Sequence, residues 1–398
     1  MKISLRISHL LFTMAVLLLP LPVRALAQPS LPTDCEEGSL PSNDAKFPGN
    51  QLILVCIPPA WNGDLVLYAH GFVPPQFELA LPIEELTLDG TFVPLAFLSQ
   101  GFAFATSSYH KNGAVTQQAS ADLNDLVQHF KRLVGARSLK RVFLVGASEG
   151  GLPLMRLLER QPQRYDGGLA LCAPIGGAPE QLQYAGDFRV VFDYFFPGVF
   201  PFGAANVPPD AFLDWETVYV PAIIQAITID LGNGGTATTQ LFTVTRAAVD
   251  PLDASSLVET ALGLLFYSVW ETPDVIATTG GMAYGNRFTK YTGSLDDAAL
   301  NAGVERVHAD RRAQNYTGRF YQTSGELRRP LVTVHNTLDP IVPFQHEVNY
   351  GELVVKAGTS QFLTVLPVEG YGHCDFTSEE IFGAFQLLLQ QATGQTGH

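Results

Sequence analysis

RVFLVGASEGGLPLMRLL, residues 141–158, is the stretch that decides how this chain folds. Its first five residues are an apolar run typical of a buried strand, and its last eight are typical of a helix. Between them lies Gly146-Ala147-Ser148-Glu149-Gly150, in which a glycine stands two positions to either side of a serine. A strand, a tight turn and a helix around G-x-S-x-G form a nucleophile elbow, which exposes the serine hydroxyl for reaction. Ser148 is therefore the predicted nucleophile.

A serine nucleophile needs a base and an acid, and in chains with this elbow they follow in the order serine, acid, histidine. Asp339 lies just past the end of the predicted strand 330–336, where open parallel sheets carry functional groups. His373 lies in the loop after a second predicted strand, 361–366. Alone, Asp339 could be a helix cap and His373 a surface side chain. Their order after Ser148, each behind its own strand, instead predicts a Ser-His-Asp triad.

A tetrahedral intermediate also needs two hydrogen-bond donors for its oxyanion. The first is predicted to be the backbone N–H of Glu149, the residue after the nucleophile. The second is predicted to be the amide of Phe72, which follows the apolar run 64–69 and a glycine that lets the chain turn. His70, at the end of that run, is interpreted as a strand-end side chain bonded to backbone.

With these motifs the chain resembles a secreted member of the α/β-hydrolase superfamily. The resemblance rests on the segments that contain Phe72, Ser148, Asp339 and His373. It covers roughly 50–180 and 325–392. It implies a mostly parallel sheet of about eight strands flanked by helices. It also implies hydrolysis of an ester or amide through an acyl-enzyme formed on Ser148.

A large internal stretch lies outside this resemblance. About 150 residues separate the strand that ends at Cys172 from the strand that starts at Leu331, far more than a crossover helix requires. We therefore expect a core in two parts, 51–179 and 326–398, with a cap inserted at 180–325. The cap contains 21 of the 42 aromatic residues of the chain. This enrichment favours a substrate with an apolar or aromatic part.

The first residues, 1–27, have the pattern of a secretory signal peptide: a basic start, the apolar run Leu10–Leu19, and small residues before the cleavage site. We expect cleavage after Ala27, then an extension, 28–50, and a secreted or periplasmic location. The apolar run is too short to span a bilayer, so no stable membrane insertion is expected.

Composition and missing motifs exclude other classes. The formal net charge of −14 argues against nucleic acid as a partner, because its phosphates demand basic patches. The sequence contains no P-loop, zinc-protease or dinucleotide motif, so we expect no cofactor and no metal. His335 and His346 flank Asp339 as alternative bases, but their predicted positions, inside a strand and at a helix start, favour packing and surface roles. The expected partner is a small-molecule or polymeric ester, and the oligomeric state is left open.

Four cysteines in an exported chain predict two disulfides, with three possible connectivities, among Cys35, Cys56, Cys172 and Cys374. A bridge between the first two would pin the extension to the sheet. A bridge between Cys172 and Cys374 would hold the loop of His373 beside the nucleophile strand. Tannases and fungal feruloyl esterases resemble this chain in having a cysteine directly after the catalytic histidine. Their second cysteine directly precedes the serine, where this chain has Ala147.

Three classes of function remain. The first is a secreted carboxylic-ester hydrolase. The second is a serine peptidase of the prolyl oligopeptidase or aminopeptidase type, suggested by Gly150-Gly151 after Ser148-Glu149, which would need a site for a peptide terminus. The third is a catalytically inactive α/β-hydrolase fold used for binding, against which the complete triad argues.

Overall fold

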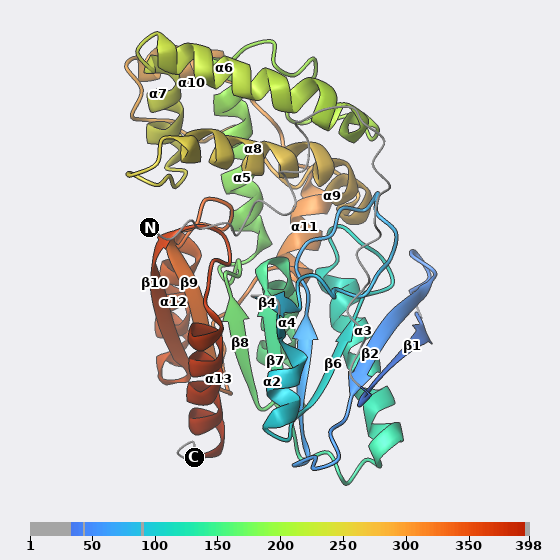
Figure 1. Ribbon diagram of the computed structural model, residues 1–398. Coiled ribbons are helices and arrows are strands. Elements are labelled where there is room, and N and C mark those ends of the chain that lie inside the picture. The colour runs from blue at the N-terminus through green and yellow to red at the C-terminus, as the bar shows by residue number, and fades with distance from the viewer. Residues whose placement is uncertain (1–32, 43, 89–90, 395–398) are drawn as a thin grey trace, which may run out of the picture.

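A sheet of eight strands forms the centre of the computed structural model, which describes residues 33–42, 44–88 and 91–394 (Figure 1). The strands, in sheet order, are β1 (Cys35–Pro41), β2 (Asn50–Cys56), β6 (Ala103–Ser107), β3 (Asp64–Ala69), β7 (Arg141–Ala147), β8 (Gly167–Leu171), β9 (Leu331–Leu338) and β10 (Leu363–Tyr371). β2 runs antiparallel to both β1 and β6, whereas every pair from β6 to β10 is parallel. A separate two-stranded ribbon pairs β4 (Thr87–Leu88) with β5 (Thr91–Phe92).

Helices cover both faces of this sheet, which is why its central strands are apolar on both sides. All residues of β3, β6 and β8 are buried. Alternate residues of a strand point to opposite faces, so Leu65 and Leu67 join one hydrophobic cluster and Val66 and Tyr68 join the other. The first cluster includes α3 (Thr116–Val134), α4 (Gly151–Arg160) and α12 (Gln345–Ala357). The second includes α2 (Pro94–Ser99) and α13 (Ser378–Thr393).

Between β8 and β9 the chain forms a layer of helices beyond the carboxyl ends of the parallel strands (Figure 1). The α-helices of this layer are α5 (Ala178–Phe195), α6 (Val220–Gly232), α7 (Thr236–Thr245), α8 (Ser255–Trp270), α9 (Thr272–Thr279), α10 (Asp297–Gly303) and α11 (Arg311–Phe320). Short 3₁₀ and π turns at Ala211–Asp214 and Trp215–Tyr219 precede α6. The layer has its own hydrophobic cluster, which contains Phe188, Trp215 and Leu265. It occupies the stretch for which the sequence predicts a cap, 180–325.

The N-terminal extension differs from its expected form. Part of the predicted extension 28–50 is β1, an edge strand paired in register with β2, and a disulfide joins Cys35 to Cys56 across that pair. Most β1 residues are exposed, so the apolar alternation that marks a half-buried strand is missing from its sequence. The predicted signal peptide, 1–27, lies outside the described residues. No helix among the described residues is long and apolar enough to cross a membrane.

Candidate active site

This strand order, with all but the second strand parallel, is the α/β-hydrolase fold that the sequence motifs predicted. In such sheets the reactive groups lie just beyond the carboxyl ends of the strands. β7, β9 and β10 are parallel neighbours of β8 or of each other, so they end at one edge. Ser148, Asp339 and His373 follow these three strands.

Ser148 occupies the sharp turn between β7 and α4. Its φ is 50°, in the left-handed region that L residues adopt at a cost of about 1–2 kcal/mol. The two flanking glycines are required by contacts. A Cβ at Gly146 would lie 2.5 Å from the carbonyl oxygen of Gly150, and a Cβ at Gly150 would lie 2.6 Å from that of His70. The predicted elbow is therefore present, with the backbone of β3 packed directly against it.

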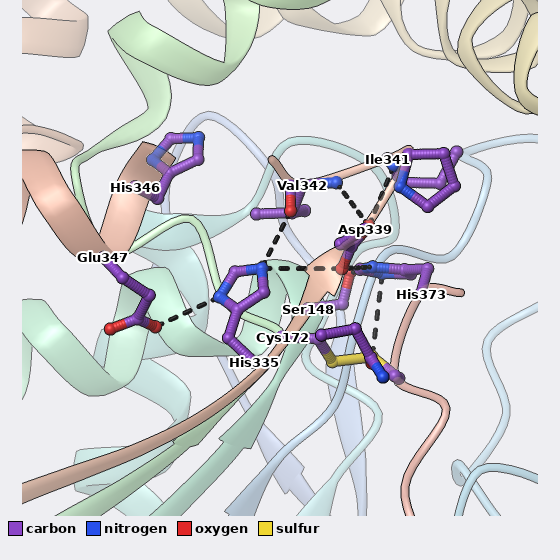
Figure 2. A network of polar contacts seen from close by, with 12 residues as sticks. Ser148, Cys172, His335, Asp339, Ile341, Val342, His346, Glu347 and His373 are labelled. Carbon is purple, nitrogen blue, oxygen red and sulfur yellow. Dashed lines mark hydrogen bonds and ion pairs between the residues drawn. A yellow bond between two sulfur atoms is a disulfide. The ribbon is translucent and has the colours of Figure 1, made fainter. Parts of the chain in front are cut away.

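Among the three predicted triad residues, His373 lies within hydrogen-bond distance of both Ser148 and Asp339 (Figure 2). His373 Nε2 is 2.9 Å from Ser148 Oγ, and His373 Nδ1 is 2.7 Å from Asp339 Oδ2. Asp339 is buried, and its Oδ1 accepts the backbone N–H groups of Ile341 and Val342 at 2.9 Å each. The imidazole thus has one nitrogen toward a carboxylate and the other toward a hydroxyl, the arrangement in which histidine can act as a base toward serine.

A second histidine lies on the opposite side of Asp339 from His373 (Figure 2). His335 Nε2 is 2.8 Å from the carbonyl oxygen of Val342 and 3.5 Å from Asp339 Oδ2, and its Nδ1 is 3.1 Å from Glu347 Oε1. Both ring nitrogens face acceptors, so both carry protons and the ring is an imidazolium. Burial alone would lower the pKa of His335, but hydrogen bonds and charges of Asp339 and Glu347 raise it to about 10.

This second histidine changes the interpretation made from the sequence. His335 is buried in β9 as expected, yet it is a charged partner of Asp339. Burial alone would raise the pKa of Asp339, but the charges of His373 and His335 and hydrogen bonds from both hold it below its usual value. Asp339 is therefore ionised. His346, the other alternative base, is buried at the start of α12 against Gln181, 3.0 Å from Nε2 to Oε1.

A disulfide joins Cys172 to Cys374, with the Cα atoms 5.2 Å apart. Cys172 directly follows β8, the neighbour of the nucleophile strand, and its backbone N–H donates to Val334 of β9 at 2.8 Å. Cys374 directly follows His373. Of the three connectivities left open, the structure therefore has the one that ties the loop of His373 to the sheet, with Cys35 and Cys56 forming the other bridge.

The two predicted oxyanion donors border a cavity that opens at Ser148. The cavity encloses about 620 Å³, part of it open to solvent, and Phe72 and Glu149 contribute to its wall. Glu149 is the second residue of a helical turn, where a backbone N–H has no partner within the helix. For the amide of Phe72, no acceptor is found among the described residues. The preceding amide, of Gly71, donates to the carboxylate of Glu85 at 3.0 and 3.2 Å and so fixes this loop.

The remaining wall of the cavity is mostly apolar, with two acidic side chains. Helices of the inserted layer and loops of the core both contribute to it: Ala114, Leu152, Pro174, Ala178, Gln181, Leu182, Tyr267, Val275, Thr279, Thr317, Tyr321, Ile341 and Val342. The acidic side chains are those of Glu149 and Glu271. Glu271, which lies between α8 and α9, was not predicted from the sequence. No local pattern marks a residue that comes close to the nucleophile elbow only after folding.

No protein-family model and no curated protein matches the sequence. Among solved structures, the closed form of Candida antarctica lipase A is similar over 92% of this chain and 79% of its own, with 14% identity and a TM-score of 0.47. Est1E from Butyrivibrio proteoclasticus is similar over 89% of this chain and 98% of its own, with 12% identity and a TM-score of 0.41.

An acylaminoacyl peptidase from Pyrococcus horikoshii is similar over 92% of this chain, with 9% identity and a TM-score of 0.43. This chain spans only 42% of the length of that peptidase. At such distances the similarities concern the course of the chain and have no bearing on its substrate.

Proposed function

We propose that this chain is an exported serine hydrolase that cleaves carboxylic esters with an apolar or aromatic part. The observation that carries the proposal is the chain of contacts from Asp339 through His373 to the Ser148 hydroxyl, at 2.7 and 2.9 Å. A largely apolar cavity opens at that hydroxyl, as a site for an apolar acyl or alcohol group requires. The two disulfides and the predicted signal peptide support export.

In the proposed reaction, Ser148 Oγ attacks the ester carbonyl carbon while His373 Nε2 accepts its proton. The oxyanion of the tetrahedral intermediate receives hydrogen bonds from the backbone amides of Phe72 and Glu149. His373 then donates the proton to the departing alcohol, which leaves an acyl group on Ser148. A water molecule repeats these steps and releases the acid. Asp339 keeps His373 oriented and stabilises the imidazolium that forms twice in each turnover.

Residues 180–325 are our proposed cap over this site. The helical layer contacts two loops of the core, the one that follows Asp339 and the one that contains Phe72. The Tyr184 hydroxyl of α5 donates to the carbonyl of Pro340 at 2.8 Å, and the ring of Tyr267 in α8 lies 5.3 Å from that of Phe72. Since Gln181, Leu182 and Tyr267 also line the cavity, the cap would determine which substrates fit.

A serine peptidase that recognises a peptide amino terminus is the second candidate. The observation that favours it is the presence of two carboxyl groups, those of Glu149 and Glu271, in the wall of the cavity. A positively charged terminus needs an anionic partner when it leaves water. An ester hydrolase acting on neutral substrates has no such need.

Labelling and turnover of the Ser148→Ala variant test the proposal. The wild type should react with a fluorophosphonate and hydrolyse p-nitrophenyl butyrate. Ser148→Ala should lose the label and about 10⁴-fold in kcat, because the nucleophile is gone. The exposed Ser138→Ala serves as the matched control and should behave as wild type.

Each alternative gives a different result. If Ser148→Ala keeps more than about a hundredth of wild-type activity, Ser148 is not the nucleophile. Faster hydrolysis of leucyl p-nitroanilide than of the ester would establish the peptidase. If the wild type neither labels nor turns over either substrate, the chain is an inactive fold.

A further inference from the structure

Two carboxyl groups, those of Glu149 and Glu271, border the cavity beside Ser148. Glu149 Oε1 accepts the backbone N–H of Val115 at 3.2 Å, whereas its Oε2 is buried and has no hydrogen-bond partner among the described residues. The Glu271 carboxyl has neither a hydrogen bond nor an ion pair within the part of the chain that the structure describes. Glu271 is only half-buried, but a buried polar atom without a partner, such as Glu149 Oε2, is rare in native proteins and calls for an explanation.

A nearby cation, Lys111, is already paired elsewhere. Its Nζ lies 3.1 Å from each carboxylate oxygen of Asp274 and 3.2 Å from Thr278 Oγ1. Asp274 also accepts the backbone N–H of Ala114 at 2.8 Å. The charge of Lys111 is therefore paired with Asp274, and it offsets only part of the cost of ionising Glu149.

The pKa values of both carboxyl groups are raised in this environment. Burial raises the pKa of Glu149 well above its usual value, and the charge of Glu271 raises it further. Burial, with the charge of Asp274, raises the pKa of Glu271 to about 8. A bound cation would stabilise both carboxyls in their ionised form.

The rest of the wall suits the carbon part of an organic cation. The aromatic rings of Phe72, Tyr267 and Tyr321 line the cavity together with aliphatic side chains such as those of Leu152 and Val275. Aromatic faces attract ammonium groups, and the attraction grows when the cation is desolvated. The cavity thus combines an anionic site, aromatic faces and apolar surface next to one serine.

We propose that the cavity binds an organic ammonium group of the substrate against the carboxylates of Glu149 and Glu271, so that the preferred substrates are cationic. This inference rests on the proposed hydrolysis at Ser148 and names the substrate class of that site. Because burial raises the pKa of both carboxyls, binding of the ammonium group should be accompanied by release of a carboxyl proton to solvent.

Calorimetric titration of the full-length Ser148→Ala variant tests binding without turnover. The probes are choline and its neutral isostere neohexyl alcohol, in which a carbon atom replaces the nitrogen of choline. Choline should bind at least about tenfold more tightly, a difference of about 1.4 kcal/mol. Adding Glu271→Gln should abolish the preference. Adding Glu259→Gln, at an exposed position of α8, is the matched control and should leave the preference unchanged.

The pH dependence of choline binding provides a second readout. The charged and titratable groups around Glu271 are Glu149 in the elbow, Tyr267 in α8, Tyr321 after α11, and Asp274 in α9 with its partner Lys111. Since choline keeps its charge at all pH values, its affinity should rise as the pH approaches 8 and Glu271 ionises. At pH 7 the heat of binding should depend on the buffer, which reports the released proton.

Equal or weaker binding of choline overturns the inference, as does a preference that survives Glu271→Gln. Tighter binding of n-butylammonium than of choline would assign the site to primary amines, and the reverse order would assign it to quaternary amines. Both results support the inference. A wild type that hydrolyses p-nitrophenyl butyrate but does not distinguish the probes refutes this inference alone. A protein that binds choline yet never labels with a fluorophosphonate refutes the proposed function alone.

Discussion

The imidazolium of His335 is the least expected charge near Ser148. It lies between the carboxylates of Asp339 and Glu347, both buried, and each of its N–H groups has an acceptor. Glu347 is held in turn by the Thr333 hydroxyl at 2.7 Å. We regard His335 and Glu347 as positioning residues, because neither touches Ser148 or His373. The charge of His335 lowers the pKa of Asp339, and Glu347 acts on Asp339 through His335, whose pKa it raises.

Glu347→Gln should therefore lower kcat about tenfold, because His335 then loses part of the support for its charge and stabilises ionised Asp339 less; a tenfold change in rate corresponds to about 1.4 kcal/mol. The variant also lowers the pKa of His335, because a carboxylate that raises it is removed. Activity should fall at alkaline pH as His335 loses its proton, and in this variant the fall should begin at a lower pH than in the wild type. A kcat profile from neutral to alkaline pH checks this, with the exposed Glu352→Gln of α12 as the control. An unshifted alkaline limb would mean that Glu347 has a structural role only.

The same histidine gives stability a dependence on pH. Its pKa is about 10 in the folded chain and near 6.5 in the unfolded chain. Its contribution to the free energy of unfolding is fully present below about pH 6.5 and is lost as the pH rises toward 10. Urea denaturation at several pH values should show this loss in the wild type and a smaller one in Glu347→Gln. Equal losses in the two proteins would contradict it.

At the scale of strands and helices, local features were predictable and contacts between distant segments were not. The elbow at Ser148 is marked by a strand, two glycines and a helix within 18 residues, so its geometry follows from local chemistry. β1 was missed because an exposed edge strand lacks apolar alternation. The partnership of His335 with Asp339, and the meeting of Glu271 with Glu149, depend on how packed segments approach. No spacing in the sequence encodes those distances.

The segment between β10 and α13 carries His373 and is held by the Cys172–Cys374 bridge. The double change Cys172→Ala with Cys374→Ala should reduce kcat about 10²-fold, as expected if the imidazole shifts by about 1 Å. Circular dichroism should show the sheet and helices intact at the assay temperature.

The other disulfide provides the control for that experiment. Cys35→Ala with Cys56→Ala opens a bridge with a sequence separation of 21 residues, far from the triad. It should keep kcat and lose about 3 kcal/mol of stability. Equal activity in the two double variants would show that the bridge next to His373 has no part in catalysis.

Across the whole molecule, the helical layer and the sheet have separate hydrophobic clusters. Proteins with more than one core commonly depart from two-state unfolding. We expect calorimetry to show two transitions. Trp215→Ala, which removes a fully buried side chain from the helical layer, should lower the melting temperature of the first transition by an amount that corresponds to about 3–5 kcal/mol. The melting temperature of the second transition should not change. A single transition that shifts as a unit would contradict independent cores.

If Ser148 is the nucleophile as proposed, its left-handed backbone, with φ of 50°, places thermal stability and activity in conflict. Glycine would relieve about 1–2 kcal/mol of strain there, more than the roughly 0.5–1 kcal/mol that its flexibility costs. Ser148→Gly should therefore melt slightly above the wild type and clearly above Ser148→Ala, although neither variant could form an acyl-enzyme. Melting curves of the three proteins decide this. Selection of variants by melting temperature alone would therefore favour inactive ones at position 148.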